Sequence, residues 1–129
     1  MSHSIQAGSL QFHVRLRVAS GATGVMGPGK AALLESIRDT GSISAAGRQL
    51  GMSYRRAWML AEELNRLFRK PLVETARGGA HGGGARLTAA GREALSCYRR
   101  MEERALNALE QDAGRFARLV APPGDPCDR

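Results

Sequence analysis

The feature that most constrains this chain is a pair of short helical segments that meet at Gly51. The first segment follows Ser42 and has Gly47 at its centre, where the absence of a side chain lets a second helix cross closely. Gly51 can adopt the positive φ that a sharp turn requires. Ser53 then serves as a helix N-cap, and the second segment runs to about Phe68. Two helices joined in this way predict a helix-turn-helix motif.

The segment that precedes the motif predicts one strand and one helix. Residues 9–19 alternate between apolar and polar side chains, which is typical of a half-buried strand. Residues 20–29 are a glycine-rich loop, and Pro28 near its end suits the first turn of a helix. That helix is expected to stop at Gly41, because glycine is favoured just beyond helix C-termini.

The segment that follows the motif predicts a hairpin and a long helix. Residues 72–75 and 85–87 favour short strands, and five glycines lie within the seven residues 78–84. Thr88 is expected to cap a helix over about residues 89–119. The fold class is therefore mainly α with a small β-sheet: a winged helix-turn-helix plus a long C-terminal helix. The expected organisation is an N-terminal tail over 1–8, one domain over 9–120 with a dimerisation helix over about 89–119, and a disordered tail over 121–129.

Charge indicates the class of partner. The net charge is +7 with a pI near 10.7, and nearly all the cations are arginine, since the lysines are Lys30 and Lys70. Such a surplus attracts polyanions, and arginine forms bidentate hydrogen bonds to phosphate and to guanine edges. The sequence has no membrane-spanning apolar run, no disulfide framework, no metal-ligand spacing and no catalytic constellation. We expect a cytoplasmic protein that is not an enzyme and needs no cofactor or metal.

The second helix of the motif is the expected DNA reader. On a helical projection of residues 54–68, the apolar side chains gather on one side, and Arg55 and Met59 lie opposite them. The N-terminal part of this helix enters the major groove in helix-turn-helix proteins. We therefore expect Arg55 to contact a base edge, and Arg56 and Ser53 to contact phosphates. The alternative is that these arginines are ordinary solvated side chains.

Two aromatic residues, Tyr54 and Trp58, lie at the borders of the apolar side. Aromatic side chains at such positions are typical of a partial core, although Tyr54 is also close enough to the helix start to reach DNA. The glycine-rich hairpin is expected to act as a wing, because glycine lets backbone N–H groups approach a sugar-phosphate strand; the alternative is a flexible loop without a role. The residues expected to contact DNA are Ser42, Ser53, Tyr54, Arg55, Arg56, Arg77, Gly79, His81 and Arg86.

Residues 24–31 nearly match the phosphate-binding loop GxxxxGK[ST]. Ala31 stands where that motif needs a hydroxyl group to hold Mg²⁺, and Pro28 removes one backbone N–H from the phosphate cradle. Nucleotide hydrolysis is therefore not expected. Lys30 is expected to meet the DNA backbone or solvent instead.

The C-terminal helix indicates a second copy of the chain. About thirty helical residues span roughly 45 Å, which exceeds the width of a small domain. The charged flanks of the contact are expected at Arg99, Arg100, Glu102, Glu103 and Arg104. The helix carries a stripe of apolar or small residues, part of which is expected to cover the domain's own core: Leu95, Tyr98, Met101, Ala105, Leu109, Phe116 and Val120. The alternative is a helix that breaks and folds back at Gly114.

The run from Gly41 to Trp58, with its segment Ser53-Tyr54-x-x-Ala57-Trp58, resembles the DNA-binding domain of the ModE-type molybdate-responsive regulators, as does the close of the wing over 85–91. The N-terminal domain of LysR-type regulators is similar too, sharing Gly41-Ser42 and Leu87-Thr88-x-x-Gly91. The resemblance implies a homodimer that binds two-fold symmetric operators, often in molybdenum uptake or use. Full-length members carry oxyanion-binding domains after the long helix, which are expected to be lacking here.

Molybdate itself is an open partner, since no residue matches a molybdate ligand of that family. Two functions of other classes also stay open. One is an oxyanion- or effector-binding module that does no sensing of its own, and the other is a partner subunit of a larger regulator.

Overall fold

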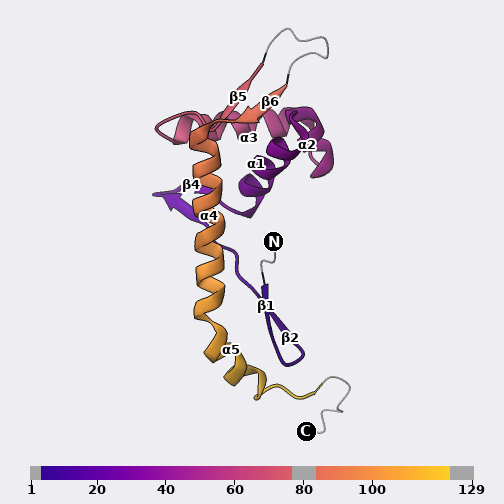
Figure 1. Ribbon diagram of the computed structural model, residues 1–129, viewed down its shortest axis with the longest axis vertical. Coiled ribbons are helices and arrows are strands. Elements are labelled where there is room, and N and C mark those ends of the chain that lie inside the picture. Colours follow the sequence, from indigo (N-terminus) through magenta and orange to yellow (C-terminus); the bar gives the residue numbers. More distant parts are fainter. Residues whose placement is uncertain (1–3, 77–83, 123–129) are drawn as a thin grey trace. The chain divides into compact units, whose positions relative to one another are not determined.

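The computed structural model describes residues 4–76 and 84–122 (Figure 1). The helices are α1 (Pro28–Thr40), α2 (Ile43–Gln49), α3 (Tyr54–Leu67), α4 (Ala89–Ala108) and α5 (Glu110–Ala117). The strands are β1 (Ser4–Ala7), β2 (Leu10–His13), β3 (Val18–Ser20), β4 (Thr23–Met26), β5 (Val73–Thr75) and β6 (Ala85–Leu87). Each strand pairs antiparallel with its neighbour in sequence, β1 with β2, β3 with β4 and β5 with β6. The chain divides into two compact units, 16–98 and the described parts of 1–15 and 99–129.

The unit over 16–98 confirms the predicted winged helix-turn-helix. α1 begins at Pro28 and ends at Gly41, which has φ +72° and donates its N–H to the Ile37 carbonyl at 2.8 Å. The turn between α2 and α3 contains Gly51 at φ +71°. A Cβ on Gly47 would lie 3.2 Å from the Cβ of Ala57, so Gly47 sits where the two helices cross closely. The local turn and crossing signals in the sequence therefore specify this motif.

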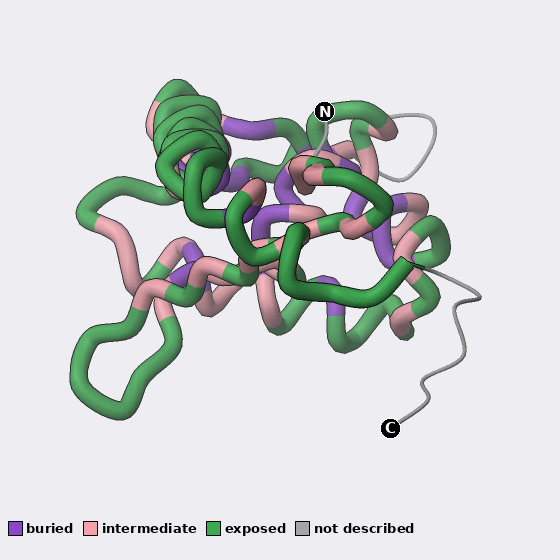
Figure 2. Tube along the Cα trace, turned by 90° about the horizontal axis from the view of Figure 1, so that it is seen from below, coloured by how far each residue is buried: buried purple, intermediate pink, exposed green. Residues whose placement is uncertain are grey.

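The core of this unit is formed mainly by α1, α3 and the first half of α4, and Figure 2 marks buried positions in purple. Its largest fully buried side chains are Leu33, Leu34, Ile37, Leu64, Leu72 and Tyr98. The Tyr98 hydroxyl donates a hydrogen bond of 2.7 Å to the Leu16 carbonyl, so the polar end of this buried ring is satisfied. The core thus joins α4 to the residues just before β3.

The start of the wing is fixed to the rest of this unit by hydrogen bonds between side chains and the backbone. The side chain of Asn65 accepts from the N–H groups of Leu72 and Val73 at 2.8 and 3.0 Å and donates to the Val73 carbonyl at 2.9 Å. The Thr88 hydroxyl accepts from the Gly91 N–H at 3.0 Å, which confirms Thr88 as the cap of α4. These contacts hold the start of β5 against α3 and against the start of α4.

The prediction of a single strand over residues 9–19 is wrong. The alternating run over 9–19 is two strands, β2 and β3, that belong to different hairpins. Ser4–Ala7 is a strand rather than a tail, because Gly8 at φ +61° turns the chain so that β1 pairs with β2. The glycine-rich loop over 20–29 contains β4, which pairs with β3 after a turn at Gly21.

The long helix is also interrupted. α4 ends at Ala108. The Leu109 N–H donates a hydrogen bond of 3.0 Å to the Leu106 carbonyl, three residues earlier, and α5 begins at the next residue. The break lies at Leu109 and not at Gly114, which is inside α5. In the second unit, Phe116 of α5 packs edge-on against Phe12 of β2 with ring centroids 6.2 Å apart. α5 therefore packs on the β1–β2 hairpin.

Candidate nucleic-acid interface

Both helices of the motif are capped by the predicted serines. The Ser42 side chain accepts from the Ala45 N–H at 3.0 Å, and the Ser53 side chain accepts from the Arg56 N–H at 3.1 Å. Each hydroxyl still has its own proton, which can be donated to an oxygen outside the chain. The N-terminal ends of these helices also favour negative charge through the helix dipole. Ser42 and Ser53 are therefore placed as phosphate contacts would require.

The start of α3 presents its largest side chains to solvent. Ala57, Ala61 and Leu64 are buried, while Arg55 and Arg56 are exposed beside the Ser53 cap. Since the cap and core side are fixed, the direction of the two arginines follows from helix geometry. The helical projection of the sequence is thus confirmed for the core side and for the arginines.

The partial-core expectation for the two aromatic residues is wrong. Tyr54 is 58% exposed and Trp58 is 43% exposed. The physical reason is the position of the wing, which meets α3 through Asn65 and so covers only its C-terminal half. Trp58 lies seven residues before Asn65, about 10 Å along the helix axis, beyond the reach of β5.

Met59 also lies opposite the core side of α3, as the helical projection predicts, but the sequence alone assigns it no role. Its side chain is 57% exposed, one turn after Arg55. The signal was present in the projection, but a methionine in a helix is ordinarily assigned to a core. The exposed end of α3 therefore combines cationic and large apolar side chains.

In the wing, Arg86 of β6 donates a 2.6 Å hydrogen bond to Glu74 of β5, directly across the strand pair. Both side chains are well exposed, so this ion pair contributes little to stability and Arg86 can exchange it for another anion. The Ala85 N–H donates to the Gly41 carbonyl at 2.9 Å, which connects the wing to the turn before α2. Arg77, Gly79 and His81 lie outside the described residues.

The segment that resembles a phosphate-binding loop has a structural role. The ammonium group of Lys30 donates to the Gly24 carbonyl at 3.0 Å and lies 3.3 Å from a carboxylate oxygen of Glu63 on α3. The Lys30 side chain is only 15% exposed. The expectation that Lys30 meets DNA or solvent is therefore wrong, because the lysine ties the start of α1 to β4 and α3.

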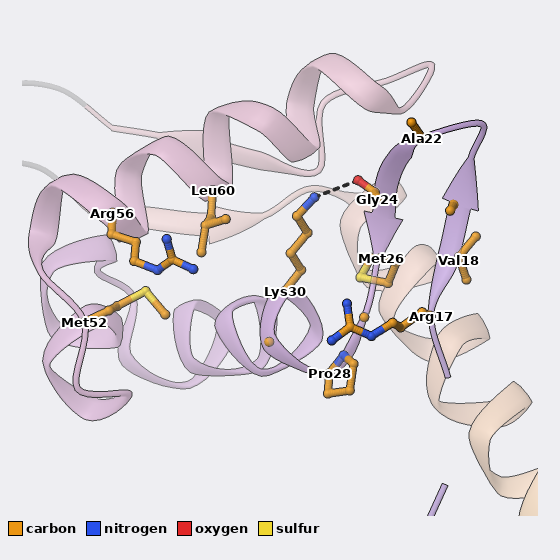
Figure 3. A pocket seen from close by; sticks show the side chains of 13 residues that line it. Arg17, Val18, Ala22, Gly24, Met26, Pro28, Lys30, Met52, Arg56 and Leu60 are labelled. Carbon is orange, nitrogen blue, oxygen red and sulfur yellow. Dashed lines mark hydrogen bonds between the residues drawn. The ribbon is translucent and has the colours of Figure 1, made fainter. Parts of the chain in front are cut away.

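A pocket of about 540 Å³ opens beside this lysine. Figure 3 shows the side chains of Arg17, which precedes β3, and Arg56, on α3, reaching into the space near the start of α1. Among the described residues, neither guanidinium has an ion-pair partner. This pocket adds a second cationic surface beside α3, which the sequence did not reveal because Arg17 is distant from the motif in the chain.

The described part of the chain contains no group of three or more potential metal ligands. Within the same residues, no helix is long and apolar enough to cross a membrane.

Comparison with known proteins bears on this surface. Residues 30–92 match the model for the bacterial regulatory helix-turn-helix proteins of the lysR family. Over 93 residues the chain is 42% identical to the molybdenum transport protein ModE of Herbaspirillum seropedicae, covering 72% of this chain and 35% of ModE. Over 77 residues it is 47% identical to the molybdenum-pterin-binding protein MopB of Rhodobacter capsulatus, covering 60% of this chain and 28% of MopB.

The DNA-binding transcriptional dual regulator ModE of Escherichia coli K12 is 38% identical over 88 residues, 66% of this chain and 34% of that protein. Among solved structures, the CbnR DBD in complex with DNA matches with a TM-score of 0.50 and 26% identity, covering 69% of this chain and 94% of the other. The chain spans about a third of the length of the curated relatives it matches.

Proposed function

This chain carries a LysR-type winged helix-turn-helix domain of the ModE kind, and on that premise we propose that it is a sequence-specific regulator of transcription that binds double-stranded DNA. The observation that carries the proposal is the start of α3. Two exposed arginines lie there beside a serine cap, Arg55 opposite the core side of the helix and Arg56 at its border. A helix that presents this end outward matches the way recognition helices enter the major groove.

The contacts divide into two kinds. Arg55 reads a base edge, and Tyr54 lies beside it at the helix start. Phosphates are bound by the caps Ser42 and Ser53 and by Arg56, which shares its pocket with Arg17. The wing adds a further backbone contact through Arg77, Gly79, His81 and Arg86. Phosphate contacts then supply most of the affinity, and base contacts supply the sequence preference.

The chain binds DNA as a homodimer. The second half of α4 and the segment over 109–120 expose apolar side chains that a single chain leaves in water: Met101, Leu109, Phe116, Leu119 and Val120. A group of exposed apolar residues of this kind marks an association surface. In the homodimer, two α3 helices about 34 Å apart would contact successive major grooves on one face of the DNA.

The biological setting follows from the relatives. Their names refer to molybdenum transport, molybdenum-pterin binding and transcription regulation, so we place the target genes in the response to molybdenum. The regulator acts in the cytoplasm, where the DNA is, and has no catalytic step. An effector-binding module or partner subunit is less favoured, because the matching relatives include DNA-binding regulators.

The decisive experiment is selection from a pool of random duplexes, followed by titration of the selected site at about 50 and 200 mM salt, each with and without molybdate. We expect a palindromic site whose advantage over random DNA persists at the higher salt. Uniform binding that salt abolishes would overturn the proposal of a sequence-specific regulator. A change of affinity on adding molybdate would identify an effector of this chain.

A further inference from the structure

The recognition end of α3 exposes two apolar side chains that the other described residues cover only in part. Met59 is 57% exposed and Trp58 is 43% exposed, and they follow one another on the surface next to Arg55. Exposing such side chains to water is unfavourable, and neither contributes to the core. We therefore expect a binding partner with an apolar group to cover Met59 and Trp58.

The floor of the major groove offers one apolar group, the 5-methyl group of thymine. We infer that Met59, with Trp58 beside it, reads thymine by burying that methyl group. This inference rests on the proposed function and names the base that the apolar part of the surface recognises. The flexible thioether of methionine can adapt its shape to a methyl group in a way that a β-branched side chain cannot.

Helix geometry gives the position of the thymine. Met59 is four residues after Arg55, which is about 6 Å along the axis of α3. Successive base pairs are about 3.4 Å apart. The thymine is therefore expected about two base-pair steps from the base that Arg55 contacts, in each half-site.

The charges around Met59 favour DNA over a protein as the occupant. Arg55, Arg56 and Arg66 lie along the same groove as Met59. Glu63, which also borders it, is paired with Lys30. A second copy of the chain docked here would bring these arginines together, whereas a DNA strand neutralises them.

The test replaces each thymine of the selected site with deoxyuridine, one position at a time. Uracil keeps every hydrogen-bonding group of thymine and lacks only the methyl group. Burying one such carbon is equivalent to about 0.8 kcal/mol, so wild-type binding should weaken about four-fold per half-site at the reading position and nowhere else. In Met59→Ala the thymine-to-uracil ratio at that position should fall to about one, and Met59→Leu should retain most of it.

Met101→Ala is the matched control, because Met101 is another exposed methionine, on α4 and outside the recognition end. Its overall affinity can change through the dimer, but its thymine-to-uracil ratio should equal that of the wild type. Trp58→Ala is expected to reduce the ratio in part.

The outcomes separate the two proposals. A protein that selects no site refutes the regulator and this inference together. A protein that selects a site with no methyl-sensitive position, or one in which Met59→Ala keeps the wild-type ratio, refutes the inference and leaves the regulator standing.

Discussion

Gly91, near the start of α4, is the position where one methyl group should do most damage. A Cβ built on Gly91 overlaps the carbonyl oxygen of Leu72 and lies 3.0 Å from its carbonyl carbon. Both of these atoms are backbone, so no side chain can rotate to make room. The same Leu72 oxygen accepts a 2.9 Å hydrogen bond from Thr88, which caps α4. We therefore expect Gly91→Ala to push the helix away from the start of the wing.

The magnitude follows from three contributions. Overpacking of a well-packed site costs about 1–3 kcal/mol. Loss of the hydrogen bond between Thr88 and Leu72 costs about 1 kcal/mol. The higher helix propensity of alanine returns up to about 1 kcal/mol. The net expectation is a loss of about 2 kcal/mol, a large part of the stability of a small domain but not enough to unfold it.

Urea unfolding followed by circular dichroism measures this loss, and the midpoint should fall by about 1 M. Gly114→Ala is the control, since Gly114 is inside α5 and its added Cβ would have no atom within 4 Å. The same chemical change should there raise the midpoint through helix propensity alone. If Gly91→Ala unfolds at the wild-type midpoint or above it, the close approach of α4 to Leu72 does not constrain the fold.

Four further substitutions test the interface, the packing of the motif and the assembly. Arg55→Ala should cost about 1–3 kcal/mol at one base position and relax preference there, whereas Arg77→Ala should weaken binding to all sequences and reduce the salt slope by about one; equal losses of specificity in titrations of both variants would contradict this division. Gly47→Leu should unfold the motif, because even its Cβ would lie 3.2 Å from Ala57, and an unchanged melting temperature would show that the helices can separate at no cost. Leu119→Glu, at a side chain 79% exposed, should shift sedimentation towards the monomer with the circular dichroism spectrum unchanged, and a sedimentation coefficient equal to that of the wild type would place the dimer contact elsewhere.

The helix-turn-helix could be predicted because its signals are local. Ser42 and Ser53 cap the helices that they precede, and Gly51 takes the positive φ that the turn requires. Each of these features depends on a few neighbouring residues, so the rest of the chain does not need to be known. The direction of Arg55 could be predicted for the same reason, since it follows from the cap and the core side of one helix.

The strands show the limit of local signals. An alternating run predicts that 9–19 is extended but not which partner each part has. Turns at Gly8 and Gly21 produce two separate hairpins, β1–β2 and β3–β4. The first of these turns pairs Ser4–Ala7 with β2, so a segment that looks like a tail in the sequence is a strand. Lys30 is a related case, because the loop sequence cannot show that Glu63, thirty-three residues later, lies within 3.3 Å of its ammonium group.

The long helix shows where periodicity misassigns individual residues. Charged side chains on a helix usually face water, so periodicity predicts Arg99 and Glu102 on the flanks of the apolar stripe. Both are buried, and their ion pair of 2.7 Å offsets part of the cost of removing each charge from water. Within the apolar stripe, Leu95 and Tyr98 are buried in the domain's own core, whereas Met101 and Leu109 are exposed. A stripe therefore predicts that a helix has an apolar surface. Only the fold shows which residues of that surface stay exposed to solvent in a single chain, and the proposed dimer depends on these exposed residues.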